Sequence, residues 1–162
     1  RQLFGETEES VADKTKRALD SELSPIVCVG ETLEEREAGQ TLEVVERQVR
    51  AVIELLAEEP GRGAIAYEPV WAIGTGKVAS PADAQAVHAR IRELLNEASE
   101  ELGESTRILY GGSVKSDNAE GLLSEADVDG ALVGGASLDA EGFAKIAQAA
   151  QAIAEREAEA DA

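Results

Sequence analysis

Cysteine, basic residues and long apolar runs are all scarce in this sequence, and each scarcity excludes a class of protein. The single cysteine, Cys28, cannot form an internal disulfide, so we expect a protein of the reducing cytoplasm. Only 15 Lys and Arg residues stand against 33 Asp and Glu, and the net charge of −18 argues against nucleic acid or an anionic membrane as partner. No apolar run approaches the roughly 20 residues that span a bilayer, and no signal-peptide pattern is present.

Motifs for metals and nucleotides are absent as well. No group of His, Cys or carboxylate residues has the spacing of metal ligands, and neither GxGxxG nor a P-loop occurs. The sequence therefore predicts neither a metal nor a cofactor. No linker rich in Pro, Gly or Ser divides the chain, so we expect residues 1–162 to form one domain.

Four short apolar runs are the candidate strands of this chain. They occupy residues 26–29, 64–67, 107–110 and 130–133. Because their apolar character is continuous rather than alternating, we expect strands that are covered on both faces, as in parallel sheets. Helical segments separate the runs, and this alternation predicts an α/β fold, either an open doubly wound sheet or a (β/α) barrel.

Two helices carry clear signals in the sequence. Apolar residues recur at steps of three and four between Leu42 and Leu56, which predicts one helix with its apolar stripe on the core. Ser80 is a good N-cap residue and Pro81 suits the first helical position, so a second helix is predicted to begin there. Thr7 is a candidate cap for an earlier helix.

Glu68 is the main candidate for chemistry. In both α/β architectures the functional residues gather just past the carboxyl ends of the strands, and Glu68 follows the second run directly. Pro69 biases the preceding residue to extended geometry and so holds the carboxylate at the strand end. Tyr67, Trp71 and Ile73 are expected to shield it from water, which suits a general base. A structural salt bridge is the alternative interpretation.

Glycines follow three of the strand ends. Gly74-Thr75-Gly76 predicts the far end of a mobile flap that begins after Glu68. The pairs Gly111-Gly112 and Gly134-Gly135 would let backbone N–H groups approach a ligand closely. In a (β/α)8 barrel the loops after the last two strands, with a short extra helix, form a common phosphate site, and we expect that helix near 137–139. Tight turns use the same glycine pairs.

Three further residues receive a structural interpretation. Glu31 lies in a crowded acidic loop with a single arginine, so we expect a salt bridge at the surface. His88, the only histidine, lies inside a helix away from any strand end, and we expect it to pack at the surface or half-buried. Cys28 is expected to be a small buried core residue.

These motifs together resemble the triosephosphate isomerase family. The segment 66–77, AYEPVWAIGTGK, is similar to the active-site signature and lid of that family. Segments 110–113 and 132–137 are similar to its phosphate-binding loops, and 30–39 is similar to its loop after strand five. The resemblance implies a TIM barrel that interconverts dihydroxyacetone phosphate and glyceraldehyde 3-phosphate through an enediol, without cofactor or metal.

The resemblance also implies a role for individual residues. Glu68 matches the glutamate that removes the proton alpha to the carbonyl. The backbone N–H groups that hold the substrate phosphate match Gly74, Ser113, Gly134 and Gly135. The lid matches Pro69, Val70, Trp71, Ala72, Ile73, Thr75, Gly76 and Lys77.

A complete barrel has eight strands and about 250 residues, whereas this sequence predicts four strands. The resemblance implies strands five to eight, a partial barrel truncated at its N-terminus, which lacks the asparagine, lysine and histidine of the family's first half. We expect such a chain to be nearly inactive by itself and to expose two sheet edges; a homodimer is expected of the full-length enzyme. The alternatives are another phosphate-binding barrel enzyme and a non-catalytic half-barrel that binds phosphate.

Overall fold

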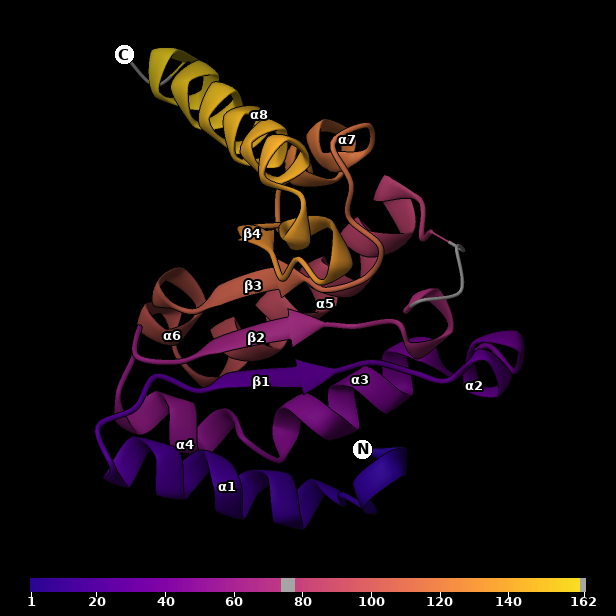
Figure 1. Cartoon of the computed structure of the whole chain (residues 1–162). Coiled ribbons are helices and arrows are strands. Elements are labelled where there is room, and N and C mark those ends of the chain that lie inside the picture. The colour runs from indigo at the N-terminus through magenta and orange to yellow at the C-terminus, as the bar shows by residue number, and fades with distance from the viewer. Residues whose placement is uncertain (74–77, 161–162) are drawn as a thin grey trace.

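Four parallel strands form the sheet of this protein (Figure 1). The computed structural model describes residues 1–73 and 78–160. The strands are β1 (Ile26–Val29), β2 (Ala64–Tyr67), β3 (Arg107–Tyr110) and β4 (Gly130–Ala131). They are hydrogen-bonded in the order β1-β2-β3-β4, and every neighbouring pair is parallel. The structure confirms the predicted α/β class, with four strands of a barrel, and the fourth strand is shorter than predicted.

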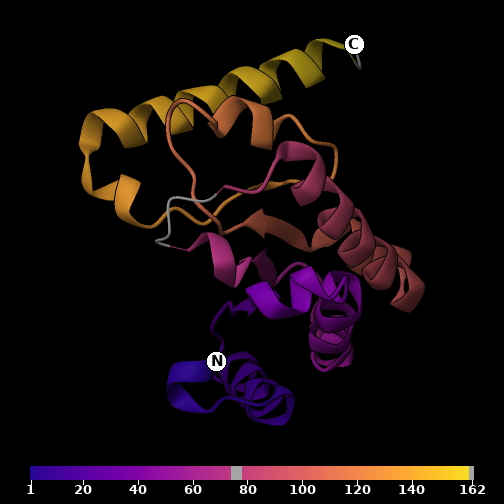
Figure 2. The same cartoon turned by 90° about the vertical axis from the view of Figure 1, so that its right-hand side faces the viewer.

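Helices fill the connections between the strands. They are η1 (Gln2–Phe4), α1 (Glu8–Asp20), α2 (Leu33–Glu37), α3 (Thr41–Arg50), α4 (Ile53–Glu58), η2 (Val70–Ala72), α5 (Pro81–Ala98), α6 (Glu100–Ser105), α7 (Ala119–Leu123), η3 (Gly135–Leu138) and α8 (Ala140–Ala160), where η marks a 3-10 turn. Figure 2 shows α3 and α5 next to each other on the same side of the sheet. Within the described ranges, no helix has both the length and the apolar character needed to cross a membrane.

The helix starts predicted at Thr7 and Ser80 are correct. The Ser80 hydroxyl accepts a hydrogen bond from the Asp83 N–H at 3.1 Å, and the Asp83 carboxylate accepts one from the Ser80 N–H at 3.3 Å. This reciprocal capping satisfies two donors that the first turn of α5 would leave unpaired. Thr7 and Ser10 form the same arrangement at the start of α1.

The single helix predicted from Leu42 to Leu56 is wrong. The chain forms α3 and then α4, with a break at residues 51–52. There the Val52 N–H donates to the Val49 carbonyl at 3.0 Å, an i→i−3 bond that tightens the turn. The chain changes direction at this turn, so that both helices bury apolar residues, while Leu42 at the start of α3 stays 46% exposed.

The first strand is covered on one face only, which corrects the prediction of cover on both faces for β1, whereas in β2 the side chains of residues 65–67 are all buried. Val27 and Val29 are buried, whereas their neighbours Ile26 and Cys28 are exposed on the other face. Consecutive parallel strands joined by right-handed crossovers place their helices on one side of a sheet. Cys28, expected in the core, therefore lies on the open face.

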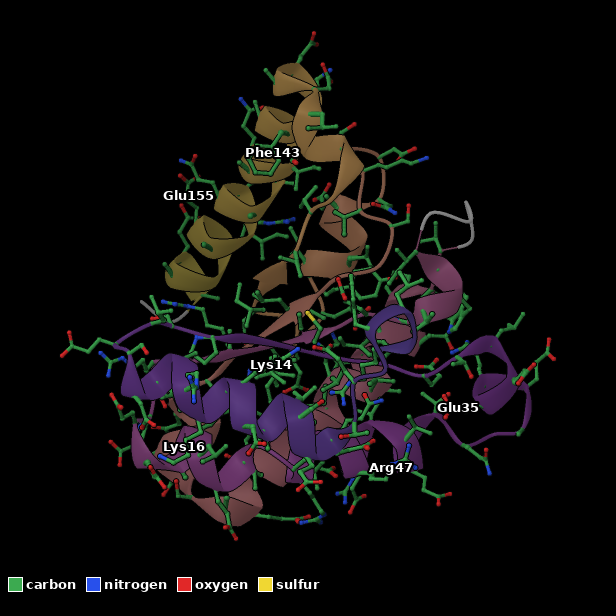
Figure 3. The ribbon with its side chains drawn as sticks, turned by 60° about the horizontal axis from the view of Figure 1, so that its bottom comes forward. Lys14, Lys16, Glu35, Arg47, Phe143 and Glu155 are labelled. Carbon is green, nitrogen blue, oxygen red and sulfur yellow. The ribbon has the colours of Figure 1, made fainter. Side chains whose placement is uncertain are left out.

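Charged side chains cover the outer surface of the helices. Figure 3 shows Lys16 and Arg47 pointing outward from α1 and α3. Lys16 pairs with Asp20 at 3.1 Å, and Arg47 pairs with Glu8 at 3.2 Å, which links α3 to α1. Exposed pairs of this kind each contribute about 0–1 kcal/mol, so the fold rests mainly on the apolar core between the helices and the sheet.

Candidate active site

Glu68 lies directly after β2 and is fixed by the two neighbouring strands. Its N–H donates to the Val29 carbonyl at 2.7 Å. A Cβ atom added at Gly30 would lie 1.9 Å from the Glu68 carbonyl oxygen, and one added at Gly111 would lie 2.5 Å from the Glu68 Cγ. Only glycine fits at both flanking positions, so the half-buried glutamate is held between the ends of β1 and β3.

A cleft of about 670 Å³ opens beside Glu68 at this edge of the sheet. Glu68, Ser113, Gly134 and Gly135 all line it, together with Ile73 from the predicted lid. The structure thus brings together the described residues to which the sequence assigns base and phosphate contacts. The other predicted phosphate contact, Gly74, lies outside the described residues, as do Thr75, Gly76 and Lys77 of the lid.

The two glycine loops contribute backbone N–H groups to the lining of this cleft. Those of Ser113, Gly134 and Gly135 donate to no acceptor within residues 1–73 and 78–160. Ser113 is half-buried, whereas Gly134 and Gly135 are exposed, so water or an anion in the cleft can accept hydrogen bonds from these N–H groups. The extra helix expected near 137–139 is a 3-10 turn, η3, which begins earlier, at Gly135.

The family model of triosephosphate isomerase matches residues 1–150 of this chain. The chain belongs to the triosephosphate isomerase family. Triosephosphate isomerase of Rhodopirellula baltica is 59% identical over 152 residues, which are 93% of this chain and 60% of the relative. That of Herminiimonas arsenicoxydans is 56% identical over 151 residues, 93% of this chain and 61% of the relative. The chain therefore spans about three fifths of the length of these curated relatives.

The segment that the sequence predicts as the start of a lid is anchored by Glu31. Pro69 leads into η2, which contains Val70, Trp71 and Ala72. The Trp71 Nε1–H donates to the Glu31 carboxylate at 2.8 Å, and the Val70 N–H donates to the Glu31 carbonyl at 3.1 Å.

Glu31 is fully buried, and the prediction of a surface salt bridge is therefore wrong in location. Its carboxylate also accepts the Tyr67 hydroxyl at 3.1 Å, and Arg36 lies 3.7 Å away. Arg36 stacks over the Trp71 ring at 4.4 Å and pairs with Asp83 at 3.2 Å. Burial, and then the Glu31 charge, raise the pKa of the Tyr67 phenol. The sequence did not predict Glu31 as a buried anchor for Tyr67 and Trp71, although its position just past β1 was a signal for such a role.

His88 lies on α5, inside the core, and is not among the residues that line the cleft. It is fully buried rather than half-buried or exposed as predicted. Its ring packs 5.9 Å from Tyr67 and 6.3 Å from Tyr110, and its Nδ1 lies 3.0 Å from the Asp127 carbonyl. Burial lowers the pKa of His88 to about 4, so the ring is neutral at physiological pH.

Cys28 lies near the predicted base. Desolvation, and then the neighbouring Glu68 carboxylate, raise the pKa of the thiol to about 11, even though the residue is exposed on the open face of the sheet. Because the thiolate is the nucleophilic form of cysteine, the raised pKa keeps this thiol mostly protonated at neutral pH. The Cys28 side chain therefore adds no charge beside the Glu68 carboxylate at neutral pH.

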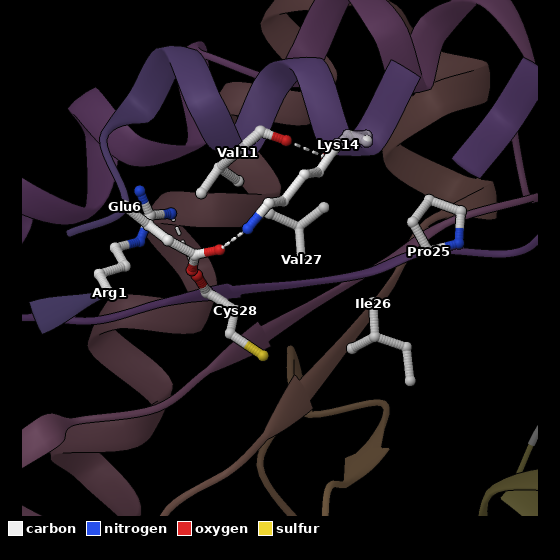
Figure 4. Close-up of a pocket in the computed structure, with 9 residues that line it drawn as sticks. Arg1, Glu6, Val11, Lys14, Pro25, Ile26, Val27 and Cys28 are labelled. Carbon is white, nitrogen blue, oxygen red and sulfur yellow. Dashed lines mark hydrogen bonds and ion pairs between the residues drawn. The ribbon is translucent and has the colours of Figure 1, made fainter. Parts of the chain in front are cut away.

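A second cavity, of about 330 Å³, lies between α1 and β1 (Figure 4). Lys14 pairs there with Glu6, and Arg1 donates to the Cys28 carbonyl at 3.1 Å. None of the predicted site residues lines this cavity. In the part of the chain that the structure describes, no three His, Cys, Asp or Glu residues are grouped to hold a metal ion.

Proposed function

We propose that residues 1–162 supply the base and much of the phosphate site of a triosephosphate isomerase, as strands five to eight of its barrel. The observation that carries this proposal is the shared cleft: Glu68 lines it together with Ser113, Gly134 and Gly135, whose N–H groups have no acceptor among the described residues. A carboxylate base and an anion cradle in one cleft suit a small phosphorylated substrate with an acidic C–H bond.

The reaction needs one base that first removes a proton from carbon and then returns it to the neighbouring carbon. In dihydroxyacetone phosphate, the Glu68 carboxylate removes a proton from the hydroxymethyl carbon next to the carbonyl, and an enediolate forms. Glu68 then returns the proton to the former carbonyl carbon, while the hydroxyl proton moves between the two oxygens, which gives glyceraldehyde 3-phosphate. No electrons leave the substrate, so this proposal requires no redox partner.

The enediolate also needs an electrophile at the carbonyl oxygen, and His88 cannot serve as one. Its ring is buried between Tyr67 and Tyr110, outside the cleft. We propose that residues of the family's first half provide this group, and that residues 1–162 form one part of a domain that is complete only with them. The homodimer and the cytoplasmic location expected of the full-length enzyme belong to the same proposal.

Isomerase activity tests this assignment directly. We would assay purified 1–162 alone and after mixing with a polypeptide that covers the first four strands of a full-length relative. Loss of a single oxyanion donor lowers turnover by about 10²–10³, so 1–162 alone should be slower than the mixture by at least that factor. In the mixture, Glu68→Gln should lower turnover by about 10²–10⁴, and the exposed Glu34→Gln should leave it unchanged.

Two results would contradict the proposal. If 1–162 alone turns over substrate about as fast as the mixture does, the electrophile lies within this chain. If the two polypeptides associate and bind phosphate but show no turnover, the non-catalytic half-barrel is the better assignment.

A further inference from the structure

The cleft offers little positive charge to a phosphorylated substrate. Among the described residues that line it, the charged side chains are Glu68, Asp139 and Lys115. Phosphate monoesters carry a charge of about −1.5 to −2 at neutral pH, and the chain itself carries −18. An anion that approaches this cleft is therefore repelled by the protein as a whole, and Lys115 is the described lining residue that can attract it.

The backbone of Lys115 is held in place next to Ser113. The Lys115 N–H donates to the Asn118 Oδ1 at 2.8 Å, and the Asn118 Nδ2 donates to the Ser113 carbonyl at 2.9 Å. One amide side chain thus fixes both residues in a single turn after β3. Lys115 and Ser113 line the same cleft, and the long, exposed side chain of Lys115 is free to turn toward an anion held there.

The Lys115 side chain differs from every other described lysine. Lys14 pairs with Glu6, Lys16 with Asp20 and Lys145 with Glu141. Lys115 is exposed and makes no ion pair with any residue in 1–73 or 78–160. In a chain with 33 carboxylate residues, a lysine at the cleft without a carboxylate partner keeps its full charge available to a ligand.

We propose that Lys115 is a substrate-binding residue, whose ammonium group attracts the phosphate of the substrate onto the Ser113 loop. This inference rests on the proposed function, because it assumes that the cleft binds a phosphate group. It adds a cation that the base and the backbone N–H groups do not provide.

Binding of inorganic phosphate to purified 1–162 tests the inference without catalysis. Amide NMR shifts of Ser113, Gly134 and Gly135 would be followed during phosphate titrations at about 0.1 M and about 1 M NaCl, where the Debye length falls from about 10 Å to about 3 Å. The variants are Lys115→Gln, Lys115→Arg and Lys145→Gln. The last is the matched control, since it removes the same charge from α8, outside the cleft.

We expect Lys115→Gln to weaken phosphate binding about threefold to tenfold at the lower salt concentration and less than twofold at the higher one. Lys115→Arg should bind like the parent chain, and so should Lys145→Gln. If Lys115→Gln and Lys145→Gln have equal affinities while phosphate still shifts the cleft amides, the inference is wrong and the proposed function stands. If phosphate shifts none of these amides in the parent chain, the phosphate site itself is wrong and the role of Lys115 is overturned with it.

Discussion

Replacement of Glu31 by glutamine tests whether a buried carboxylate holds η2, the start of the predicted lid. Glu31 accepts hydrogen bonds from the Trp71 indole at 2.8 Å and the Tyr67 hydroxyl at 3.1 Å, and its charge faces Arg36 at 3.7 Å. Glutamine keeps the size of the side chain and one acceptor oxygen. It removes the charge and places an NH₂ group, a donor, where the second oxygen stood.

The expected loss of stability follows from these contacts. A hydrogen bond to a charged group contributes about 1.5–3 kcal/mol, against about 0.5–1.5 kcal/mol for a neutral one. Two such bonds weaken in Glu31→Gln, and Arg36 loses one of its two carboxylate partners and keeps Asp83. We therefore expect the free energy of unfolding to fall by about 2–3 kcal/mol.

Urea unfolding measures this loss with two probes. Circular dichroism follows the helices, and fluorescence follows Trp71, the only tryptophan in the chain. At an m-value of about 2 kcal/mol/M, the expected change moves the midpoint by about 1 M urea. The control is Glu34→Gln, an exposed glutamate on α2 that should change stability by less than about 0.5 kcal/mol. Equal midpoints for the two variants would refute the anchoring role of Glu31.

Three further measurements test the packing and the electrostatics of the fold. Gly30→Ala should destabilise the chain by more than about 2 kcal/mol, because the new Cβ would overlap the Glu68 backbone. Gly111→Ala should destabilise it less, because its Cβ would overlap the Glu68 side chain instead. Similar urea midpoints for the two variants would contradict this order. The folded-state pKa of His88, about 4, lies below its ordinary value of 6.5. His88 therefore lowers the free energy of unfolding as pH falls from 6.5 to about 4, by about 3 kcal/mol in total. This loss of stability between pH 6.5 and about 4 should vanish in His88→Gln. If the free energy of unfolding of the variant still falls equally steeply with pH, His88 is not its cause. Raising NaCl from about 0.1 M to about 1 M should stabilise the chain by about 1 kcal/mol through screening of its negative charge, and a lower thermal midpoint at high salt would show that self-repulsion is not important.

Local signals in the sequence predicted the strands and the helix starts well. The first three strands have the predicted bounds, because each is a short apolar run, interrupted only by Arg107 at the start of the third. The caps at Thr7 and Ser80 are equally local, since donor and acceptor lie within three residues. The break between α3 and α4 was missed because neither glycine nor proline marks residues 51–52.

Burial of polar residues was not predictable in the same way. Glu31 meets Tyr67 and Trp71, which lie 36 and 40 positions further along the chain. His88 contacts the Asp127 carbonyl, 39 positions away. A glutamate among acidic neighbours and a histidine inside a helix are usually exposed or half-buried, and only the meeting of distant strands and loops places these two inside the protein. Sequence patterns that describe neighbours along the chain contain no information about such meetings.

The position of Glu68 depends on both kinds of information. Pro69 fixes it locally at the end of β2, but its neighbours across the sheet follow from strand register. Val29, Tyr67 and Tyr110 are aligned across three strands, so the next residues along each strand are Gly30, Glu68 and Gly111. A shift of one residue in the β1 pairing would bring Val29 or Glu31 against Glu68, and a shift of β3 in one direction would bring Tyr110, where the glycines leave no room for a Cβ. The two glycines and the register therefore require each other, and together they set where the carboxylate meets the cleft.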